Sequence, residues 1–535
     1  MTVLNPSKPS DRIDGPTINE GAKQSQPPGL FLLFIVEMWE RFSYYGMRAL
    51  LVLYLVTKTT GMDGQPPGFN PGRGWSKPDA TNLYGWYTGL AYLVPIIGGL
   101  IADKLIGTHR SMLVGGLIIA LGHITLAASG IGELARNDVG MAVFVCGLAL
   151  IVLGTGHFKP CVSVMVGQLY GPSDPRRDGG FSIFYMGINL GAFICAFVCG
   201  TLGEKVGWHW GFGSAAVGMI LGLIIYTIGR PRLLQGIGLP PQGKPNVAPL
   251  FFLISLGLAA TFAVLYHTGV LHSVQNGSNR FFENKLALTA LAAVVLAGVA
   301  AFVASQRPDD KGPVLSIFVF MVFNVVFWVA FEQAGSSLNL FAQENTNRMI
   351  GKWEMPTTWF QSVNPLLIIA LAPLFGIMWS TLGKRNRNPS QAMKIAMGLF
   401  LLSFGYVFMV MGGKFAASGV RVSMFWLMAT YFFHTLGELC LSPTGLSYVT
   451  KAAPIRFVSL LMGIWFLSNF LANKLGGTLA GLTEGIEQGK IDLFWYRWFR
   501  LGGQADFYLL FVIAAGGAGI LMLVLVPLMK RLARE

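Results

Sequence analysis

Ionisable residues stand out where the sequence is otherwise apolar, and four lie in its first apolar run: Glu37, Glu40, Arg41 and Arg48. At about 100° per helical residue, these side chains and Tyr44 share one face of a helix. An ionised side chain inside a bilayer costs roughly 2.5–3.5 kcal/mol on insertion scales, so it is expected to face a protein interior or a watery cavity. Carboxylates and guanidinium groups in such a place can exchange protons or bind a charged solute.

Three more ionisable residues, Lys159, Glu332 and Glu438, lie in other apolar runs. The whole set has four acids and three bases, so one carboxyl group remains after pairing, and its protonation would make the set neutral. This count favours a proton that binds and leaves during a transport cycle. The alternative is a set of structural ion pairs, although buried pairs stabilise a fold only weakly. Lys474 complicates the count, and we expect its side chain to reach toward the membrane interface.

A site with positive and negative charges suits a ligand that carries both charges. Arg41 and Lys159 would hold a carboxylate, the arginine through two parallel hydrogen bonds, while Glu438 would hold an ammonium group. Asn189 and Asn364 could hydrogen-bond amide groups, with a helix–helix contact as the alternative. Aromatic residues of the same runs would add stacking area, with ordinary packing as the alternative: Tyr44, Tyr45, Tyr92, Trp328 and Trp465.

The elements that carry these residues are expected to be membrane-spanning helices. The chain is 53% hydrophobic and 12% charged, with a mean hydropathy of +0.56, which is more apolar than a soluble globule of its size. Runs of about 20 apolar residues predict one helix each. The predicted spans number fourteen: 30–57, 80–103, 111–130, 140–168, 180–202, 212–229, 249–270, 286–305, 314–335, 356–380, 392–412, 422–450, 457–482 and 506–529.

The order of the spans predicts an all-α membrane protein with two six-helix bundles and two extra helices. Glycines followed by basic residues recur in two loops, Gly98 to Arg110 and Gly376 to Arg385, as parallel repeats require. The predicted parts are an N-terminal tail (1–29), an N-terminal bundle (30–230), a linker with the extra helices (231–312) and a C-terminal bundle (313–535).

Charge and cysteine usage exclude several other classes. Basic loops favour cytoplasmic termini, and the net charge of +14 is scattered over them, which argues against nucleic-acid binding. All five cysteines fall in apolar runs and predict neither disulfides nor a metal site. No serine hydrolase, zinc protease or nucleotide-binding motif is present, so we expect no enzyme, no cofactor and no ATP drive.

The string Glu37-x-x-Glu40-Arg41-Phe-x-Tyr44-Tyr45-Gly46 resembles the signature of the proton-dependent oligopeptide transporter family, a branch of the major facilitator superfamily. Four further segments agree with that family: Gly98-Gly-x-x-Ala-Asp103, Phe158-Lys159-Pro160, Phe184-Tyr-x-x-Ile-Asn189-x-Gly191 and Gly437-Glu438-x-x-x-Ser442-Pro443. The resemblance spans nearly the whole chain, and the extra helix pair resembles bacterial members. His157 departs from the family, whose members commonly have an aromatic residue there.

The resemblance implies a symporter that imports di- and tripeptides with protons by alternating access, in the bacterial inner membrane, without a cofactor and as a monomer surrounded by lipid. It implies proton coupling by Glu37, Glu40, Arg41 and Lys159, and an outer gate closed by Arg48 with Glu332. It assigns the peptide C-terminus to Arg41 and Lys159. It assigns the peptide's N-terminal end to Glu438, Asn189 and Asn364. The rest of the binding pocket would be formed by Tyr44, Tyr45, Tyr92, Trp328, Ser442 and Trp465.

Two alternatives share this scaffold. A transporter of another small anionic or zwitterionic solute would not need the complete acid–acid–arginine motif together with an opposing acid at Glu438. A peptide sensor that moves nothing is compatible with the same residues, and only a transport measurement separates it from a carrier.

Overall fold

The computed structural model describes residues 25–534, except 63–64, 172, 244, 272, 274–283 and 494–499. The side chains of 285, 288 and 442–447 are also outside the description, so the predicted binding role of Ser442 lies outside the described residues. Fourteen helices of 19 or more residues account for most of the described chain. They are α1 (Pro28–Val56), α2 (Lys77–Ile101), α3 (Thr108–Ala128), α4 (Asp138–Gln168), α5 (Arg177–Cys195), α7 (Trp208–Leu233), α8 (Ala248–His267), α10 (Lys285–Ala304), α11 (Pro308–Phe331), α13 (Val363–Lys384), α14 (Gln391–Ala416), α15 (Phe425–Ala452), α16 (Val458–Ala480) and α18 (Ala505–Ala533).

Short elements connect or extend these helices. The helical ones are η1 (Ala102–Ile106), η2 (Gly132–Ala135), η3 (Ala196–Gly200), α6 (Thr201–Lys205), η4 (Glu332–Gly335), α12 (Ser337–Glu344), η5 (Thr357–Ser362), η6 (Ile455–Phe457) and α17 (Leu482–Glu487). Two small sheets pair β1 (Thr346–Asn347) with β4 (Val422–Ser423) in parallel, and β2 (Met349–Ile350) with β3 (Trp353–Glu354) antiparallel.

Local chemistry explains several helix boundaries. The side chains of Ser76, Asn137 and Ser390 accept hydrogen bonds from backbone N–H groups in the first turns of α2, α4 and α14, as N-cap residues do. Gly107 joins η1 to α3 with a φ of 80°, a left-handed conformation in which a side chain would be strained. The glycine-rich loop predicted after the second span therefore has a conformational role.

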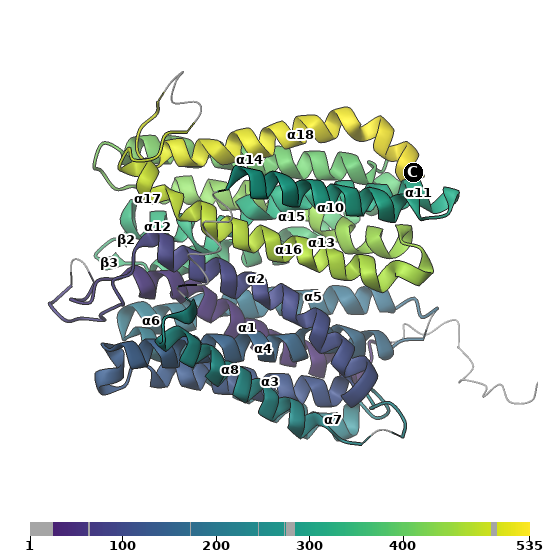
Figure 1. Ribbon diagram of the computed structural model, residues 1–535, viewed down its shortest axis with the longest axis horizontal. Coiled ribbons are helices and arrows are strands. Elements are labelled where there is room, and N and C mark those ends of the chain that lie inside the picture. Colours follow the sequence, from purple (N-terminus) through teal and green to yellow (C-terminus); the bar gives the residue numbers. More distant parts are fainter. Residues whose placement is uncertain are drawn as a thin grey trace, which may run out of the picture.

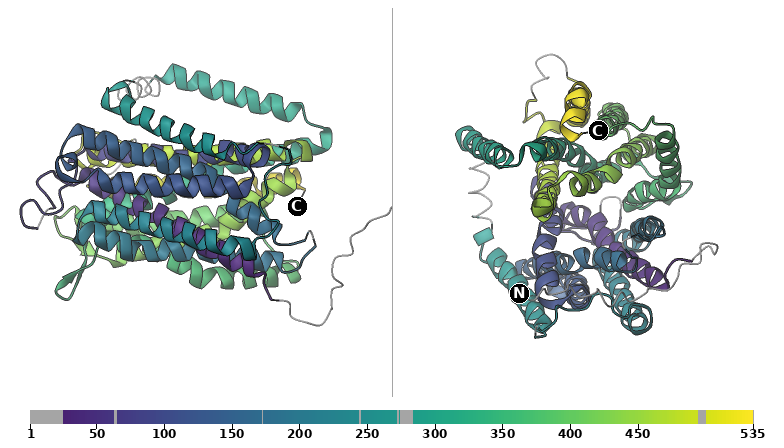
Figure 2. Two further views of the ribbon diagram at one scale, coloured as in Figure 1. Left: turned by 90° about the horizontal axis from the view of Figure 1, so that it is seen from below. Right: turned by 90° about the vertical axis from the view of Figure 1, so that its right-hand side faces the viewer.

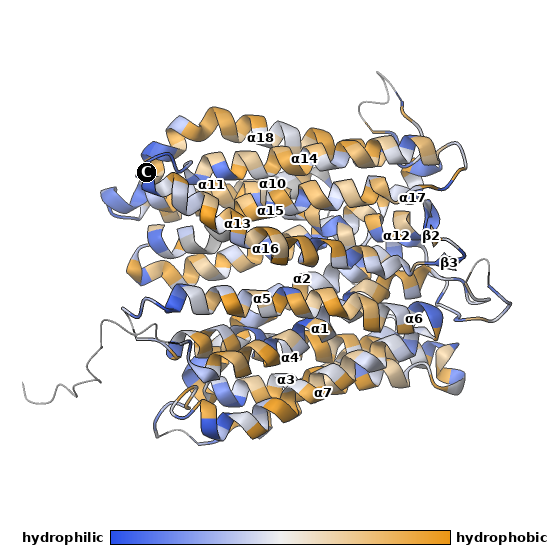
Figure 3. Cartoon of the chain, turned by 180° about the vertical axis from the view of Figure 1, so that it is seen from behind, coloured by the Kyte–Doolittle hydropathy of each residue, from blue (hydrophilic) through white to orange (hydrophobic). Residues whose placement is uncertain are grey.

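The described residues include 11 helices long and apolar enough to cross a membrane, so the protein is a multi-pass membrane protein. The long helices outside that set are α1, α10 and α15. Much of the length of the helices in Figure 3 is coloured hydrophobic, as expected for helices in a membrane. The described chain has as many long helices as predicted spans, and 11 of these helices have the length and hydropathy of a membrane span.

The helices form two groups that lie side by side (Figure 1). The helices from α1 to α7 share two buried apolar clusters, and those from α11 to α18 share a third. The extra helices lie outside the two groups (Figure 2), where α8 packs on α3 and α4, and α10 on α11. Their peripheral placement agrees with the absence of embedded charges in their sequence.

The two groups touch directly where α2 crosses α16. A Cβ atom added at Gly477 would come within 2.4 Å of the Thr81 carbonyl oxygen and 2.7 Å of the Gly85 Cα. Only residues without side chains fit at such a backbone approach. The glycines at 85 and 477 therefore set the distance between the two halves.

Candidate functional site

The predicted charged stripe forms a buried ion-pair cluster on α1. Nε of Arg41 lies 3.1 Å from Oε1 of Glu37 and also hydrogen-bonds Oε2 of Glu40. All three side chains are buried, and Nη2 of Arg41 has no hydrogen-bond partner among the described residues. One guanidinium group thus serves two carboxylates and still has a donor for a further acceptor.

Lys159, on α4, is held by an aromatic face. Its Nζ lies 3.8 Å from the centre of the Tyr92 ring, a cation–π contact between α4 and α2. Within the described part of the chain, no carboxylate lies within 4.0 Å of this ammonium group, although Glu37 and Glu40 are within electrostatic range. Lys159 therefore lies near the acidic cluster without a direct ion pair.

Tyr44 and Tyr45 link the two cations of α1. Their rings meet edge to face, with centres 5.2 Å apart. The Arg41 guanidinium lies 5.4 Å from the Tyr44 ring centre, and that of Arg48 lies 5.7 Å from the Tyr45 ring centre. The predicted stripe is therefore one continuous polar and aromatic face.

In the second half, Glu438 on α15 meets Asn364 on α13. Nδ2 of Asn364 donates to Oε2 of Glu438 at 2.9 Å and to Oγ1 of Thr435 at 3.0 Å. Glu438 is buried, and in the described ranges no cation lies within 4.0 Å of it. The other three acids of the predicted set each contact an arginine, so Glu438 is the carboxylate that remains unpaired among the described residues.

The remaining predicted site residues have local partners. Nε1 of Trp328 donates to Oδ1 of Asn324 at 3.0 Å. Nδ2 of Asn189 donates to the carbonyl oxygen of Tyr185 at 3.0 Å, one turn earlier on α5, and Trp465 is buried in the apolar cluster of its own half. The structure does not join these three to the charged groups.

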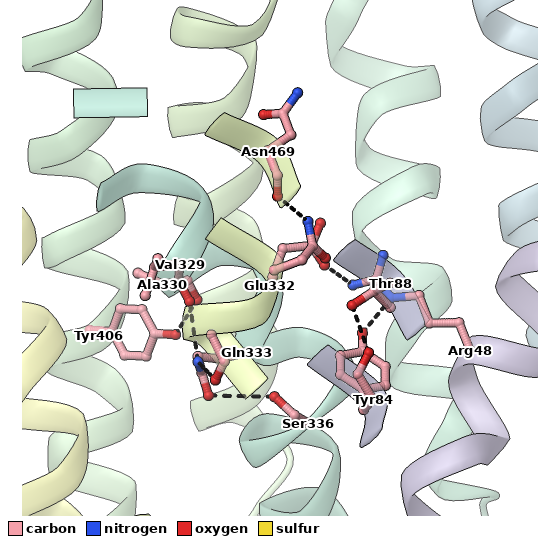
Figure 4. Close-up of polar contacts among 12 residues, drawn as sticks. Arg48, Tyr84, Thr88, Val329, Ala330, Glu332, Gln333, Ser336, Tyr406 and Asn469 are labelled. Atoms are coloured by element: carbon pink, nitrogen blue, oxygen red, sulfur yellow. Dashed lines mark hydrogen bonds and ion pairs between the residues drawn. The ribbon is translucent and has the colours of Figure 1, made fainter. Parts of the chain in front are cut away.

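Arg48 and Glu332 form a buried ion pair between the halves (Figure 4). Nε of Arg48 also donates to the hydroxyl of Tyr84 at 2.6 Å, so the guanidinium group is held from two sides. Tyr84, on α2, is a residue that sequence reasoning missed.

More polar contacts join the halves at the same end of the molecule, where α1 ends and α6, α12 and α17 lie; we call this the linked end (Figure 1). Lys77 pairs with Glu344 at 2.8 Å, and Nδ2 of Asn339 donates to the Ala49 carbonyl oxygen at 3.0 Å. The C-terminus lies at the opposite end (Figure 1).

Glu204, on α6, provides a second set of contacts at the linked end. Its buried carboxylate accepts the backbone N–H groups of Thr357 and Thr358 at 2.8 Å each, and the Thr358 hydroxyl at 2.8 Å. Sequence reasoning missed Glu204, although a carboxylate two residues beyond a predicted span was a visible signal.

Lys474, which we expected to reach toward the membrane interface, has partners in both halves. Its ammonium group binds the side-chain oxygens of Asn82 on α2 and, at 3.0 Å, of Thr478 on α16. It also lies 5.1 Å from the Trp86 ring centre. Because α16 crosses α2 here, the lysine has a hydrogen-bond partner in the other half.

Two helical halves, buried charges on their facing helices and an ion pair that ties the halves together define a membrane transport protein with the major facilitator-type fold. The sequence model described as the POT family matches residues 109–495. The peptide transporter YePEPT of Yersinia enterocolitica is 38% identical over 461 residues, covering 84% of this chain and 86% of that protein.

A di-/tripeptide transporter of Lactococcus lactis subsp. cremoris is 35% identical over 471 residues, covering 86% of this chain and 90% of that protein. A crystal structure of a peptide transporter POT in complex with sulfate has a TM-score of 0.75 and 35% identity, with 96% of each chain covered. The chain belongs to the POT family.

Proposed function

We propose that this protein imports di- and tripeptides together with protons by alternating access. The observation that carries the proposal is the division of charge between the halves. Arg41, with its unpartnered Nη2, and Lys159 belong to the first half, while Glu438 belongs to the second. A zwitterionic peptide between them would meet a cation at its carboxylate and an anion at its ammonium group.

The acid cluster on α1 supports proton coupling. Glu37 and Glu40 share the single guanidinium group of Arg41, so one of the two carboxylates can take a proton while the other keeps its ion pair. A peptide carboxylate that binds Arg41 and Lys159 competes with these acids and favours their protonation. Peptide and proton would then bind together.

The rest of the peptide would be held by neutral groups in the pocket. Asn364 already binds Glu438 and would position it for the ammonium group. The proposed contacts to the peptide's side chains and amide group come from these residues: Tyr44, Tyr45, Tyr92, Asn189, Trp328, Ser442 and Trp465.

The proposed orientation places both termini in the cytoplasm of a bacterial inner membrane. The linked end then faces outward, and Arg48 with Glu332 closes the outer gate. Bundles 30–230 and 313–535 would rock against each other, while the tail (1–29) and the linker helices (231–312) remain peripheral. The protein would work as a monomer in contact with lipid.

Uptake by purified protein in liposomes tests the proposal. A labelled dipeptide is expected to accumulate under an inward-acid gradient and not without it. Glu37→Gln or Glu40→Gln should abolish gradient-driven accumulation and spare peptide exchange. Accumulation equal to the wild type would refute proton coupling by these acids.

The contact to the peptide carboxylate has its own test. Lys159→Ala should weaken the binding of free peptides more than that of C-terminally amidated ones, and an equal loss would remove Lys159 from this role. A protein that binds peptides but gives no counterflow would be a sensor, and one that accumulates only other anions would have a different substrate.

A further inference from the structure

A cavity of about 210 Å³ lies at the linked end, between the extra helix α8 and the N-terminal half. Its wall comes from the loop that follows α1, the loop that precedes α4, the first turns of α4 and the last turn of α8. Clefts that enclose a whole small-molecule ligand usually measure about 300–1,000 Å³. This cavity therefore has room for a small polar group and not for a large ligand.

Charges of both signs line the cavity. Arg73 and Arg136 are its cations, and Asp138 is its anion. In the part of the chain that the structure describes, neither arginine lies within 4.0 Å of a carboxylate, and Asp138 lies within 4.0 Å of no cation. Arg136 and Asp138 are also exposed, so all three charges are available to a bound group.

The protein holds Arg73 in place. Its Nε donates to the Tyr54 hydroxyl at 2.7 Å, and Nη1 and Nη2 donate to the carbonyl oxygens of Asn137 and Leu134 at 3.0 Å each. A guanidinium group has five N–H donors, so with three in use two are left for an acceptor outside the described residues. An anion in the cavity would meet donors that are already positioned.

Two aromatic side chains, Trp75 and Tyr266, complete the polar wall and are partly buried. Tryptophan and tyrosine are enriched at the depth of lipid headgroups, and the faces of their rings attract ammonium groups. The rings and Asp138 thus suit a cation, while the two arginines suit an anion. The wall as a whole matches a small zwitterionic group.

The position of the cavity favours a lipid over a water-soluble ligand. Helices α4 and α8, which are long and apolar enough to span a membrane, begin and end at its wall. Helix α8 lies on the outside of the molecule (Figure 2), and only 17% of its most apolar stretch is buried. Val264, near Tyr266, and Val139, next to Asp138, are 59% and 50% exposed. Charged groups at the level of the headgroups therefore adjoin an apolar surface that acyl chains can cover.

We propose that this cavity binds the headgroup of a phospholipid that carries both a phosphate and an ammonium group, as phosphatidylethanolamine does. Arg73 and Arg136 hold the phosphate through charge-assisted hydrogen bonds. Asp138, Trp75 and Tyr266 hold the ammonium group, and the acyl chains lie against α8 and the start of α4. The lipid attaches α8 to the N-terminal half, at a site separate from the buried ion-pair cluster and independent of the proposed transport.

Lipid retention by the purified protein, measured by native mass spectrometry, tests the site. The protein in detergent is titrated with dioleoylphosphatidylethanolamine or with dioleoylphosphatidylglycerol, whose headgroup has a phosphate but no ammonium group. Arg136→Gln should weaken the binding of both lipids about fivefold, because both present a phosphate. Asp138→Asn should weaken the binding of phosphatidylethanolamine about fivefold without weakening that of phosphatidylglycerol.

Lys352→Gln is the matched control, because it removes an exposed cation at the linked end that does not line the cavity. It should change the retention of neither lipid. The unfolding temperatures of Arg136→Gln and Asp138→Asn should stay near the wild-type value, since both side chains are exposed and have no ion pair within the described ranges.

Wild-type retention of both lipids in Arg136→Gln overturns the site, and so does an equal loss in Lys352→Gln. An equal loss of both lipids in Asp138→Asn overturns the ammonium contact. Glycerophosphoethanolamine, the headgroup without acyl chains, and a dipeptide should each fail to displace phosphatidylethanolamine at equal concentration. Displacement by either would assign the cavity to a water-soluble ligand and refute the lipid site.

Discussion

Neutralising Glu332 is expected to open the linked end. In Glu332→Gln, Arg48 keeps its bond to Tyr84 but loses its only described carboxylate partner. A hydrogen bond to a charged group contributes about 1.5–3 kcal/mol, and each 1.4 kcal/mol changes an equilibrium constant tenfold. The ratio of open to closed molecules at this end should therefore rise about 10- to 100-fold.

Distances between the halves report that ratio. Ile131, beyond the end of α3, and Ile350, on β2, lie at the linked end on opposite halves and are 69% and 53% exposed. Spin labels at Ile131→Cys and Ile350→Cys, with the five native cysteines replaced, give a distance distribution by pulsed electron resonance. We expect Glu332→Gln to add or enlarge a longer-distance component.

Glu354→Gln is the matched control, because it breaks an ion pair within one half. Glu354 lies 2.8 Å from Arg348 and 3.8 Å from Arg421, which all belong to the second half. Its loss should leave the distances between the halves unchanged. An unchanged distribution in Glu332→Gln, or an equal change in Glu354→Gln, would refute the gating role of the Arg48–Glu332 pair.

Three further predictions concern the other contacts. Glu204→Gln replaces one of the two carboxylate oxygens that accept the N–H groups of Thr357 and Thr358 by an NH2 donor, so the same distance measurement should shift outward; an unchanged distribution would exclude a role in closure. Asn364→Leu removes the donor that positions Glu438. It should weaken the binding of peptides with a free amino terminus about fivefold in competition assays and leave the binding of N-acetylated peptides unchanged. Lys474→Met removes contacts to α2 and should also enlarge the open fraction, whereas a lower unfolding temperature alone would assign the lysine to stability.

The sequence predicted the site best where ionisable side chains lie in an apolar, membrane-spanning helix. Glu37, Glu40, Arg41 and Arg48 are out of place in an apolar helix, so their position predicted a buried face, and the structure places all four in the interior. Helical periodicity also predicted that their face is shared. The family could be recognised from the same residues because their spacing is so specific.

Contacts between the halves could be predicted much less well. The partners of Lys474 and Glu204 lie 392 and 153 residues away in the chain, and no local pattern specifies such pairs. We expected the Lys474 side chain to reach toward the interface, and its partner on α2 was not foreseen.

The glycine contact between α2 and α16 has a mechanical consequence. Gly85 and Gly477 meet without side chains that would have to disengage when the helices tilt. The crossing can therefore serve as a fulcrum, where a change of angle leaves the packing almost intact. The hydrogen bonds and ion pairs of the linked end tie the halves together beside this crossing, so a substrate or a proton that changes these few polar groups can change how readily the helices tilt.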